Sequence, residues 1–265
     1  MGIPGYRSRT GDLLLHKEDK MKKLYKTICF GIWMYFNLRH LRPFHYKIKG
    51  FRDAGDFEKE REQILNSTTT WGKGIMNKFK VKLTVKGLEN IPEGPVLFVS
   101  NHQGYADIPV FGAAITMKQI GFVSKTTLGK IPVFGEWIRD IRSIFLDRDD
   151  PRASLRTIEE GVEFLKQGFS LVIFPEGTRS RGPQMGEFKK GSLRLATKAG
   201  VPVVPVTLNG TYHMYEDMGY VQPGAEIEFY INPAIETKEL SKTEANNLAE
   251  KVEEIIKTKL IELQA

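Results

Sequence analysis

The sequence predicts an α/β fold, a layered domain with a mostly parallel central sheet flanked by helices. From Phe79 onward, short apolar or alternating runs of β type follow one another, and helical stretches separate several of them. Strands that alternate with helices are typical of layered domains in which most strands run parallel. The predicted strands are residues 79–87, 96–100, 121–124, 144–147, 171–174, 203–208 and 226–231.

The predicted helices carry start and stop signals. Asp150 and Pro151 suit the beginning of one helix, and Gly168 suits its end. Ser241 and Glu244 have the spacing of a capping box at the start of the last helix. At 265 residues with 41% hydrophobic residues, the chain is long enough for one such domain and a small appended segment.

The first fifty residues carry all of the excess positive charge. They contain 11 Lys and Arg against 3 Asp and Glu, whereas the remaining residues contain 28 against 29. Such a patch attracts either nucleic acid or an anionic membrane surface, and charge alone does not choose between them. The single cysteine, Cys29, excludes an internal disulfide and fits a reducing compartment.

Residues 24–38 form an aromatic, apolar run between basic flanks. The run is short for a bilayer-spanning helix, which needs about 20 apolar residues. Aromatic rings with basic flanks suit the headgroup boundary, and a dense apolar helix suits lipid better than nucleic acid. We therefore expect a membrane-associated helical segment that does not span; the alternative is a core helix packed on the main domain. The expected division is a disordered leader over 1–20, a helical membrane-anchoring segment over 21–77 and the α/β domain over 78–265.

One of the five histidines stands where α/β folds place their chemistry. His102 directly follows the second predicted strand, and Asp107 comes one loop turn later, before a new helix. A neutral imidazole removes a proton from a hydroxyl near neutral pH, and a carboxylate on its other nitrogen holds the tautomer. We interpret His102 as a general base with Asp107 behind it. The alternative for Asp107 is the N-cap of the following helix.

A second polar loop, PEGTRSRG, follows the fifth predicted strand. Arg179 and Arg181 each offer paired bonds to phosphate oxygens, and Gly177 lets backbone come close to a ligand. Thr178 supplies a hydroxyl, and Glu176 is able to accept hydrogen bonds from a polyol or a ribose. The alternative is a solvent-exposed turn.

Charged residues also follow the third and fourth predicted strands, at Lys125 and at Asp147-Arg148. Four strand ends with polar groups on one sheet edge describe a cleft with one base and several cations. Such a cleft suits an acceptor that carries both a hydroxyl and a phosphate. The sequence has no GxSxG elbow, no P-loop and no GxGxxG, and its His and Cys do not cluster at metal-ligand spacing.

These loops carry the motifs of a known family. The chain resembles the glycerolipid acyltransferases, typified by the bacterial enzymes that acylate 1-acyl-glycerol 3-phosphate. Their NHxxxxD motif matches residues 101–107, FPEGTRS is present at 174–180, and a VPVVPV-like strand spans 201–206. Their GxxFIDR motif appears as RSIFLDR, with Arg142 in place of the glycine. The resemblance covers about residues 75–235, and the first and third motifs together are highly specific.

The resemblance implies acyl transfer and assigns roles to the matching residues. His102 would be the base on the free hydroxyl of a lysophospholipid, and Asp107 would orient and charge-balance it. The residues that would hold the glycerol phosphate or shape the acceptor pocket are Lys125, Arg148, Glu176, Gly177, Thr178 and Arg179. The donor would be a thioester on coenzyme A or acyl carrier protein, attacked directly, with no cofactor and no metal. The N-terminal segment would lie on the cytoplasmic leaflet.

Three rival functions remain at this point. One is an acyltransferase for another acceptor, such as a lysophospholipid with a larger head or an ornithine lipid. A second is a non-catalytic lipid-binding module, against which the intact His102–Asp107 pair argues because a binder needs no base. The third is a nucleic-acid binder, which only the basic N-terminus favours.

Overall fold

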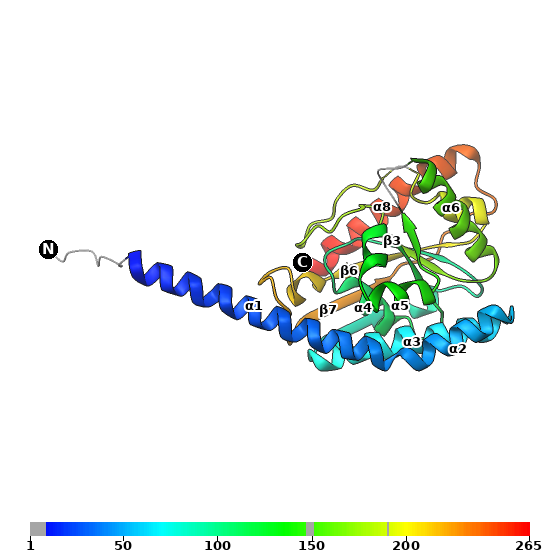
Figure 1. The fold of residues 1–265 in the computed structure, drawn as a ribbon. Helices are drawn as coiled ribbons and strands as arrows, with labels where there is room; N and C mark the ends of the chain where they lie inside the picture. The colour runs from blue at the N-terminus through cyan, green and yellow to red at the C-terminus, as the bar shows by residue number, and fades with distance from the viewer. Residues whose placement is uncertain (1–8, 147–150, 190) are drawn as a thin grey trace.

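The computed structural model describes residues 9–146, 151–189 and 191–265. Over these residues a central sheet lies between two layers of helices (Figure 1). Its strands are β1 (Lys82–Lys86), β2 (Leu97–Ser100), β3 (Gly121–Lys125), β4 (Ile144–Leu146), β5 (Leu171–Ile173), β6 (Val203–Asn209) and β7 (Glu226–Ile231). The predicted α/β fold and all of the predicted strands are confirmed, with differences of a few residues at their ends.

The helices account for most of the remaining chain. They are α1 (Arg9–His40), α2 (Arg42–Asp53), α3 (Phe57–Lys78), α4 (Asp107–Ala114), α5 (Phe134–Asp140), α6 (Pro151–Lys166), α7 (Arg194–Ala199) and α8 (Lys242–Gln264). Short 3₁₀ helices are η1 (Leu88–Asn90), η2 (Thr126–Lys130) and η3 (Thr211–Met214). The capping box before α8 is confirmed, because the Ser241 hydroxyl accepts the Glu244 N–H and the Glu244 carboxylate accepts the Ser241 N–H. Asp150 lies outside the described residues.

The sheet has the strand order β1-β7-β6-β2-β5-β3-β4. Every neighbouring pair is parallel except β6 and β7, which are antiparallel. The five strands from β6 to β4 therefore point the same way. Their carboxyl ends meet at one edge, so the loops after β2, β5 and β6 emerge side by side, as in other open α/β sheets.

The alternation of side chains along the strands divides the core in two. Phe98, Val172 and Val204 point to the face covered by α2 to α5. Leu97 and Leu171, one position away on their strands, point to the face covered by α6 to α8. Both faces of the sheet are thus buried, which explains why the central strands read as continuous apolar runs rather than as alternating ones.

Two glycines bring α3 and α4 into backbone contact. A Cβ atom on Gly72 would lie 2.6 Å from the carbonyl oxygen of Pro109, and one on Gly112 would lie 2.7 Å from that of Thr68. Side chains at these positions would push the helices apart. Since α4 begins at Asp107, the packing of α4 against α3 fixes the position of Asp107 relative to the end of β2.

The N-terminal region differs from the expected division in two ways. Residues 9–20, expected to be a disordered leader, form the first turns of α1, because the stretch after Gly11 lacks helix breakers. Helix α3, expected within the anchoring segment 21–77, belongs to the core, where its Ile64, Trp71 and Ile75 are buried. The α/β domain therefore begins before residue 78.

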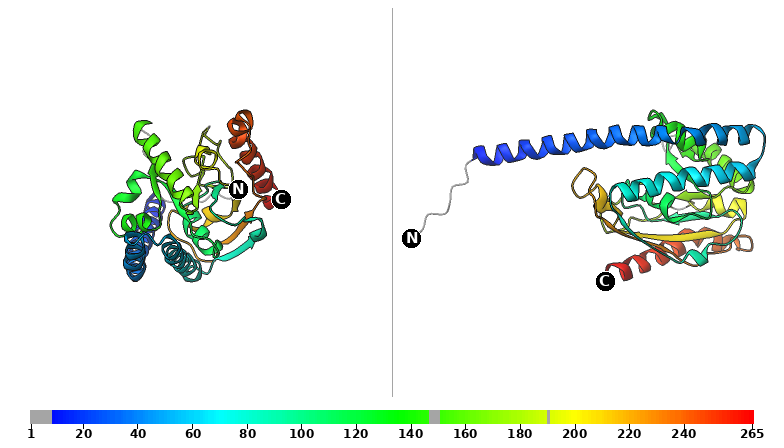
Figure 2. Two further views of the ribbon diagram at one scale, coloured as in Figure 1. Left: turned by 90° about the vertical axis from the view of Figure 1, so that its right-hand side faces the viewer. Right: turned by 90° about the horizontal axis from the view of Figure 1, so that it is seen from below.

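Helix α1 extends from the body as a long rod, and only its C-terminal part lies against the other helices (Figures 1 and 2). Leu38 and Leu41 at that end are buried, and the Trp33 ring meets Phe79 edge to face at 5.6 Å. Among the described helices, none combines the length and apolar character that crossing a bilayer requires. The alternative of a core helix packed on the main domain therefore holds only for the C-terminal part of α1, on the face that contacts the other helices.

Arg142 replaces the glycine of the GxxFIDR pattern and explains why a glycine suits the position. Its φ is 60°, in the left-handed region that side chains rarely adopt. Its guanidinium makes a two-bond contact with the fully buried Glu60 of α3, at 2.7 and 2.8 Å, and lies over the rings of Phe164 and Phe169. These contacts compensate for the backbone strain and tie the start of β4 to α3.

Glu60 also accepts a bond of 2.7 Å from Arg52, so its removal takes away both of these bonds of Arg142 and leaves Arg52 bonded to the Asp140 carbonyl. We expect Glu60→Ala to lower the free energy of unfolding by about 3–5 kcal/mol, the usual cost of breaking a buried pair on one side. Urea denaturation measures this. The control is Glu62→Ala, an exposed residue of the same helix, with an expected change within about 0.5 kcal/mol. Equal effects of both substitutions would contradict this account.

Candidate active site

The structure brings His102 and Asp107 into direct contact. His102 lies two residues beyond β2, and Asp107 is the first residue of α4. The distance from His102 Nδ1 to Asp107 Oδ2 is 2.6 Å. Asp107 is fully buried, whereas the His102 side chain is 19% exposed. The pair therefore has a shielded carboxylate and an imidazole open to a ligand.

Asp107 does not act as an N-cap. The cap position of α4 is Ala106, which makes no side-chain capping bond. The Asp107 carboxylate instead accepts bonds from the His102 ring, from the Gly104 N–H at 3.1 Å and from the Thr211 hydroxyl. The alternative interpretation of Asp107 is thus wrong.

The imidazole of His102 is held on two sides. Its ring stacks on Phe174 with centroids 4.2 Å apart and an angle of 19°. With Nδ1 bonded to Asp107, Nε2 makes no hydrogen bond within the described part of the chain. Asn101 fixes the start of the loop, because its side chain bonds both the N–H and the carbonyl oxygen of Leu208 in β6. The free nitrogen is therefore presented by a rigid support.

Backbone bonds join the loop after β2 to the PEGTRSRG loop after β5. The Ser180 N–H donates to the His102 carbonyl at 2.8 Å, and the Arg181 N–H donates to the Gln103 carbonyl at 3.1 Å. Glu176 accepts the His102 N–H at 2.6 Å and the Gly186 N–H at 2.7 Å. The base and the arginine-bearing loop are therefore one unit.

Glu176 faces into the protein instead of toward a polyol. Both of its oxygens accept backbone N–H groups, and burial raises the pKa of its carboxyl, while those two bonds act to lower it. Its contribution is to shape the loop from beneath. Gly177 adopts φ 74°, so the turn needs a left-handed residue there, and Thr178 is exposed beside it. The exposed-turn alternative fits Thr178 and fails for Glu176.

Arg179 lies in the same loop in a constrained position. Its Nη1 donates to Glu216 Oε1 at 2.8 Å, and its guanidinium carbon lies 3.5 Å from the centroid of the Tyr105 ring. Its side chain is 19% exposed. Lys125, at the end of β3, is exposed and has no ion pair in the described ranges. Asp147 and Arg148 lie outside the described residues.

Two further residues of the site, Thr211 and Glu216, were not predicted from the sequence. Both follow β6, on the same sheet edge as the other two loops. Thr211 is fully buried, and its N–H and hydroxyl also approach Oε1 of Gln103. Both residues follow the VPVVPV-like strand. Their position just after a strand end is the one feature of the sequence that could have indicated them, because the same position indicated site residues after the other strands.

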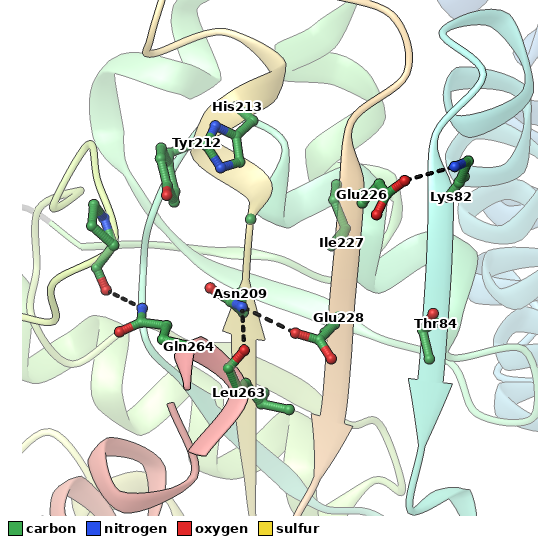
Figure 3. A pocket seen from close by; sticks show the side chains of 12 residues that line it. Lys82, Thr84, Asn209, Tyr212, His213, Glu226, Ile227, Glu228, Leu263 and Gln264 are labelled. Carbon is green, nitrogen blue, oxygen red and sulfur yellow. Dashed lines mark hydrogen bonds and ion pairs between the residues drawn. The ribbon is translucent and has the colours of Figure 1, made fainter. Parts of the chain in front are cut away.

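A separate open pocket of about 750 Å³ lies where β6 ends and β1 and β7 begin (Figure 3). It includes the ion pair of Lys82 with Glu226, at 2.6 Å, and the ring of His213, which bonds Asp217. No residue of the 101–107 or 174–182 loops lines it. The pocket is therefore distinct from the site of His102.

Comparison with known proteins decides the family. Residues 82–209 match the acyltransferase family model. The chain is 32% identical over 183 residues to a probable 1-acyl-sn-glycerol-3-phosphate acyltransferase of Mycoplasma pneumoniae, covering 65% of this chain and 68% of that protein. The chain belongs to the acyltransferase family. A crystal structure of the 1-acyl-sn-glycerophosphate acyltransferase of Thermotoga maritima matches with a TM-score of 0.77 and 32% identity, covering 93% of this chain and 98% of that one.

Chloroplast relatives are more similar in sequence but much longer. The chain is 42% identical over 133 residues to a 1-acyl-sn-glycerol-3-phosphate acyltransferase of Arabidopsis thaliana. The match covers 49% of this chain, and the chain spans only 36% of the length of that relative. The family match contains both loops that meet at His102, so the acyltransferase motifs and the contacts described above coincide in space.

The contact of Thr211 with Asp107 gives a test of how the buried carboxylate is held. We expect Thr211→Val to lower the free energy of unfolding by about 1–3 kcal/mol, because Asp107 loses a buried hydrogen-bond donor. Thr211→Ser, which keeps the hydroxyl, should recover most of the loss. Urea denaturation checks both. The exposed Thr243 of α8 provides the control, and a Thr243→Val change as costly as Thr211→Val would argue against the contact.

Proposed function

We propose that this acyltransferase moves a fatty acyl group from acyl-CoA or acyl-acyl carrier protein to the free sn-2 hydroxyl of 1-acyl-glycerol 3-phosphate, giving phosphatidic acid. The observation that carries the proposal is the contact of His102 with the buried Asp107, which leaves Nε2 free beside the Arg179 loop. The names of the relatives support the same reaction.

The chemistry follows from the two ring nitrogens of His102. Nε2 takes the proton of the acceptor hydroxyl as its oxygen attacks the thioester carbonyl, and Asp107 stabilises the imidazolium that forms. The new C–O bond forms, the C–S bond breaks, and the imidazolium returns its proton to the thiolate. The base is regenerated, and the reaction consumes no cofactor and needs no metal.

The acceptor phosphate is assigned to Arg179. The guanidinium offers further N–H donors beyond the one used by Glu216, and charge-assisted bonds to phosphate are strong. Lys125, at the end of β3, is proposed to support the same phosphate, and Arg148 is proposed to do so on the sequence motif alone. Thr178 is exposed at the rim of this loop and is proposed to contact the acceptor, whereas Glu176 supports the loop from below.

A mutant assay with a panel of acceptors tests the proposal. We expect His102→Ala to lower turnover about 10²–10⁴-fold, the usual effect of losing a general base. The measurement follows release of the thiol with palmitoyl donors on both carriers. The acceptors are 1-acyl-glycerol 3-phosphate, glycerol 3-phosphate and lyso-lipids with larger heads.

The chain contains a matched control. His213 also bonds an aspartate, Asp217, but it is exposed and lies outside the site. His213→Ala should leave turnover unchanged. Near-normal turnover of the His102 variant would refute the mechanism, and a wild-type preference for a larger head group would move the acceptor to another lyso-lipid.

We further propose that α1 lies on an anionic membrane surface at the cytoplasmic face. Large apolar side chains spaced along one side of α1 are exposed, between 43% and 69%. They are Met21, Leu24, Tyr25, Ile28, Ile32, Tyr35 and Phe36. A continuous apolar stripe on a projecting helix, with lysines beside it, fits insertion into the headgroup boundary. The exposed apolar side chains of α1 favour lipid over nucleic acid as its partner.

Vesicle flotation tests the stripe. We expect the double variant Ile28→Asp/Phe36→Asp to bind anionic vesicles at least tenfold less, since burying one large apolar side chain contributes about 1.5–3 kcal/mol. For the wild type, high salt should release only part of the protein and detergent should release all of it, because salt screens the lysines and leaves the apolar contact intact.

The control double variant is Leu155→Asp/Ile261→Asp, which changes two exposed apolar residues on other helices, 51% and 60% exposed. It should float like the wild type. Equal loss by both double variants would show a general effect of added charge, and complete release of the wild type by salt would contradict insertion.

A further inference from the structure

Glu216 occupies an unusual place between the two loops of the site. Its side chain is 3% exposed, although it follows η3 in a loop. Oε1 accepts two bonds, from Arg179 Nη1 at 2.8 Å and from the Tyr105 N–H at 3.0 Å. Oε2 is buried and has no hydrogen-bond partner within the described residues.

The backbone around Glu216 is shaped to admit it. A Cβ atom on Gly104, in the loop between His102 and Asp107, would lie 2.5 Å from Glu216 Oε2 and 2.9 Å from its carboxyl carbon. A side chain at position 104 would therefore displace the carboxylate. The absence of a side chain at Gly104 therefore leaves the space that the Glu216 carboxylate occupies.

The contact of Glu216 with Arg179 differs from the structural pair formed by Glu60 and Arg142. In that pair both carboxylate oxygens meet two guanidinium nitrogens. Here a single nitrogen, Nη1, is bonded and the remaining N–H groups of Arg179 have no protein partner in the described ranges. A buried carboxylate oxygen without a hydrogen-bond partner lowers stability. The geometry of Glu216 therefore does not suit a purely structural role.

The ring of Tyr105 completes the arrangement. It lies under the guanidinium at 3.5 Å and meets Tyr215 edge to face at 5.3 Å. A planar guanidinium stacked on a ring and bonded at one end has little freedom to turn. Its unused edge is then held in one direction, ready for two parallel bonds to a phosphate.

We propose that Glu216 is a positioning residue, which holds Arg179 against Tyr105 so that the free edge of the guanidinium receives the phosphate of the acceptor. The inference rests on the proposed function, since it assigns the phosphate to Arg179. Burial raises the pKa of Glu216, and the bonds from Tyr105 and Arg179 act to lower it, so the arginine helps to keep the carboxylate charged. The residue acts through Arg179 and does not touch the reacting atoms.

A double-mutant cycle tests the proposal. The variants are Glu216→Ala, Glu216→Gln, Arg179→Ala and the double Glu216→Ala/Arg179→Ala. The phosphate-bearing acceptor is 1-acyl-glycerol 3-phosphate, and the readouts are kcat, the KM values for this acceptor and for the donor, and the Kd for the same acceptor in dilute detergent. A neutral monoacylglycerol serves as the acceptor without phosphate, and the adjacent exposed Asp217→Ala serves as the control.

We expect Glu216→Ala to raise the KM and Kd for the phosphate-bearing acceptor about tenfold or more, the effect of losing a bond to a charged group. The KM for the donor and the KM for the neutral acceptor should change less than about twofold, because neither involves the bond between Arg179 and the acceptor phosphate. Glu216→Gln keeps an oxygen for Nη1 and should recover most of the affinity. In the Arg179→Ala background, Glu216→Ala should add almost nothing, because the two residues act as one unit.

Three results would overturn the proposal: a normal KM and Kd in Glu216→Ala, equal losses in both backgrounds, or an equal loss with the neutral acceptor. Glu216→Leu, which keeps a side chain of similar size but offers Nη1 no oxygen, carries the test if the alanine variant does not fold. A wild-type protein that transfers acyl groups to no acceptor would refute the proposed function separately. The Kd of the variants for 1-acyl-glycerol 3-phosphate would then still decide whether Glu216 positions Arg179.

Discussion

The buried carboxylate of Asp107 determines how the loops of the site are held together. A carboxylate without exposed surface is tolerated only where donors surround it, and Asp107 meets the His102 ring, the Gly104 N–H and the Thr211 hydroxyl. These groups come from the loops after β2 and β6. Neither loop can move without leaving charge unpaired, so the orientation of the imidazole is set by the fold as a whole.

The parallel sheet supplies the second half of this arrangement. β2 lies between β5 and β6, and their carboxyl ends share one edge. The loop after β5 is joined to His102 through Ser180, and the loop after β6 reaches Asp107 through Thr211. The base with its carboxylate partner, the arginine-bearing loop and the threonine that holds the carboxylate thus meet although they come from three distant parts of the sequence. An acceptor with a hydroxyl next to a phosphate has the complementary chemistry.

The sequence predicted those parts of the structure that follow from local pattern. The strands, the capping box at Ser241 and the His102–Asp107 contact all arise from neighbouring residues or short motifs. Thr211 and Glu216 could not be predicted in the same way, because their contacts join residues 104 and 37 positions apart. The left-handed backbone of Arg142 likewise depends on Glu60 of α3. Helix α3 was expected within the anchoring segment 21–77, because the sequence alone does not show that this helix packs against α4.

The tautomer of His102 decides whether Nε2 is the ring nitrogen that can accept the proton of the acceptor hydroxyl. In protein with isotope-labelled histidine, long-range proton–nitrogen NMR reports which ring nitrogen carries the proton, and the His102→Ala spectrum assigns the signal. Because Asp107 accepts a bond from Nδ1, the account predicts a neutral imidazole protonated at Nδ1, with Nε2 free to take a proton from the acceptor. A neutral ring protonated at Nε2 would contradict it, because that nitrogen would have no free pair for the hydroxyl proton.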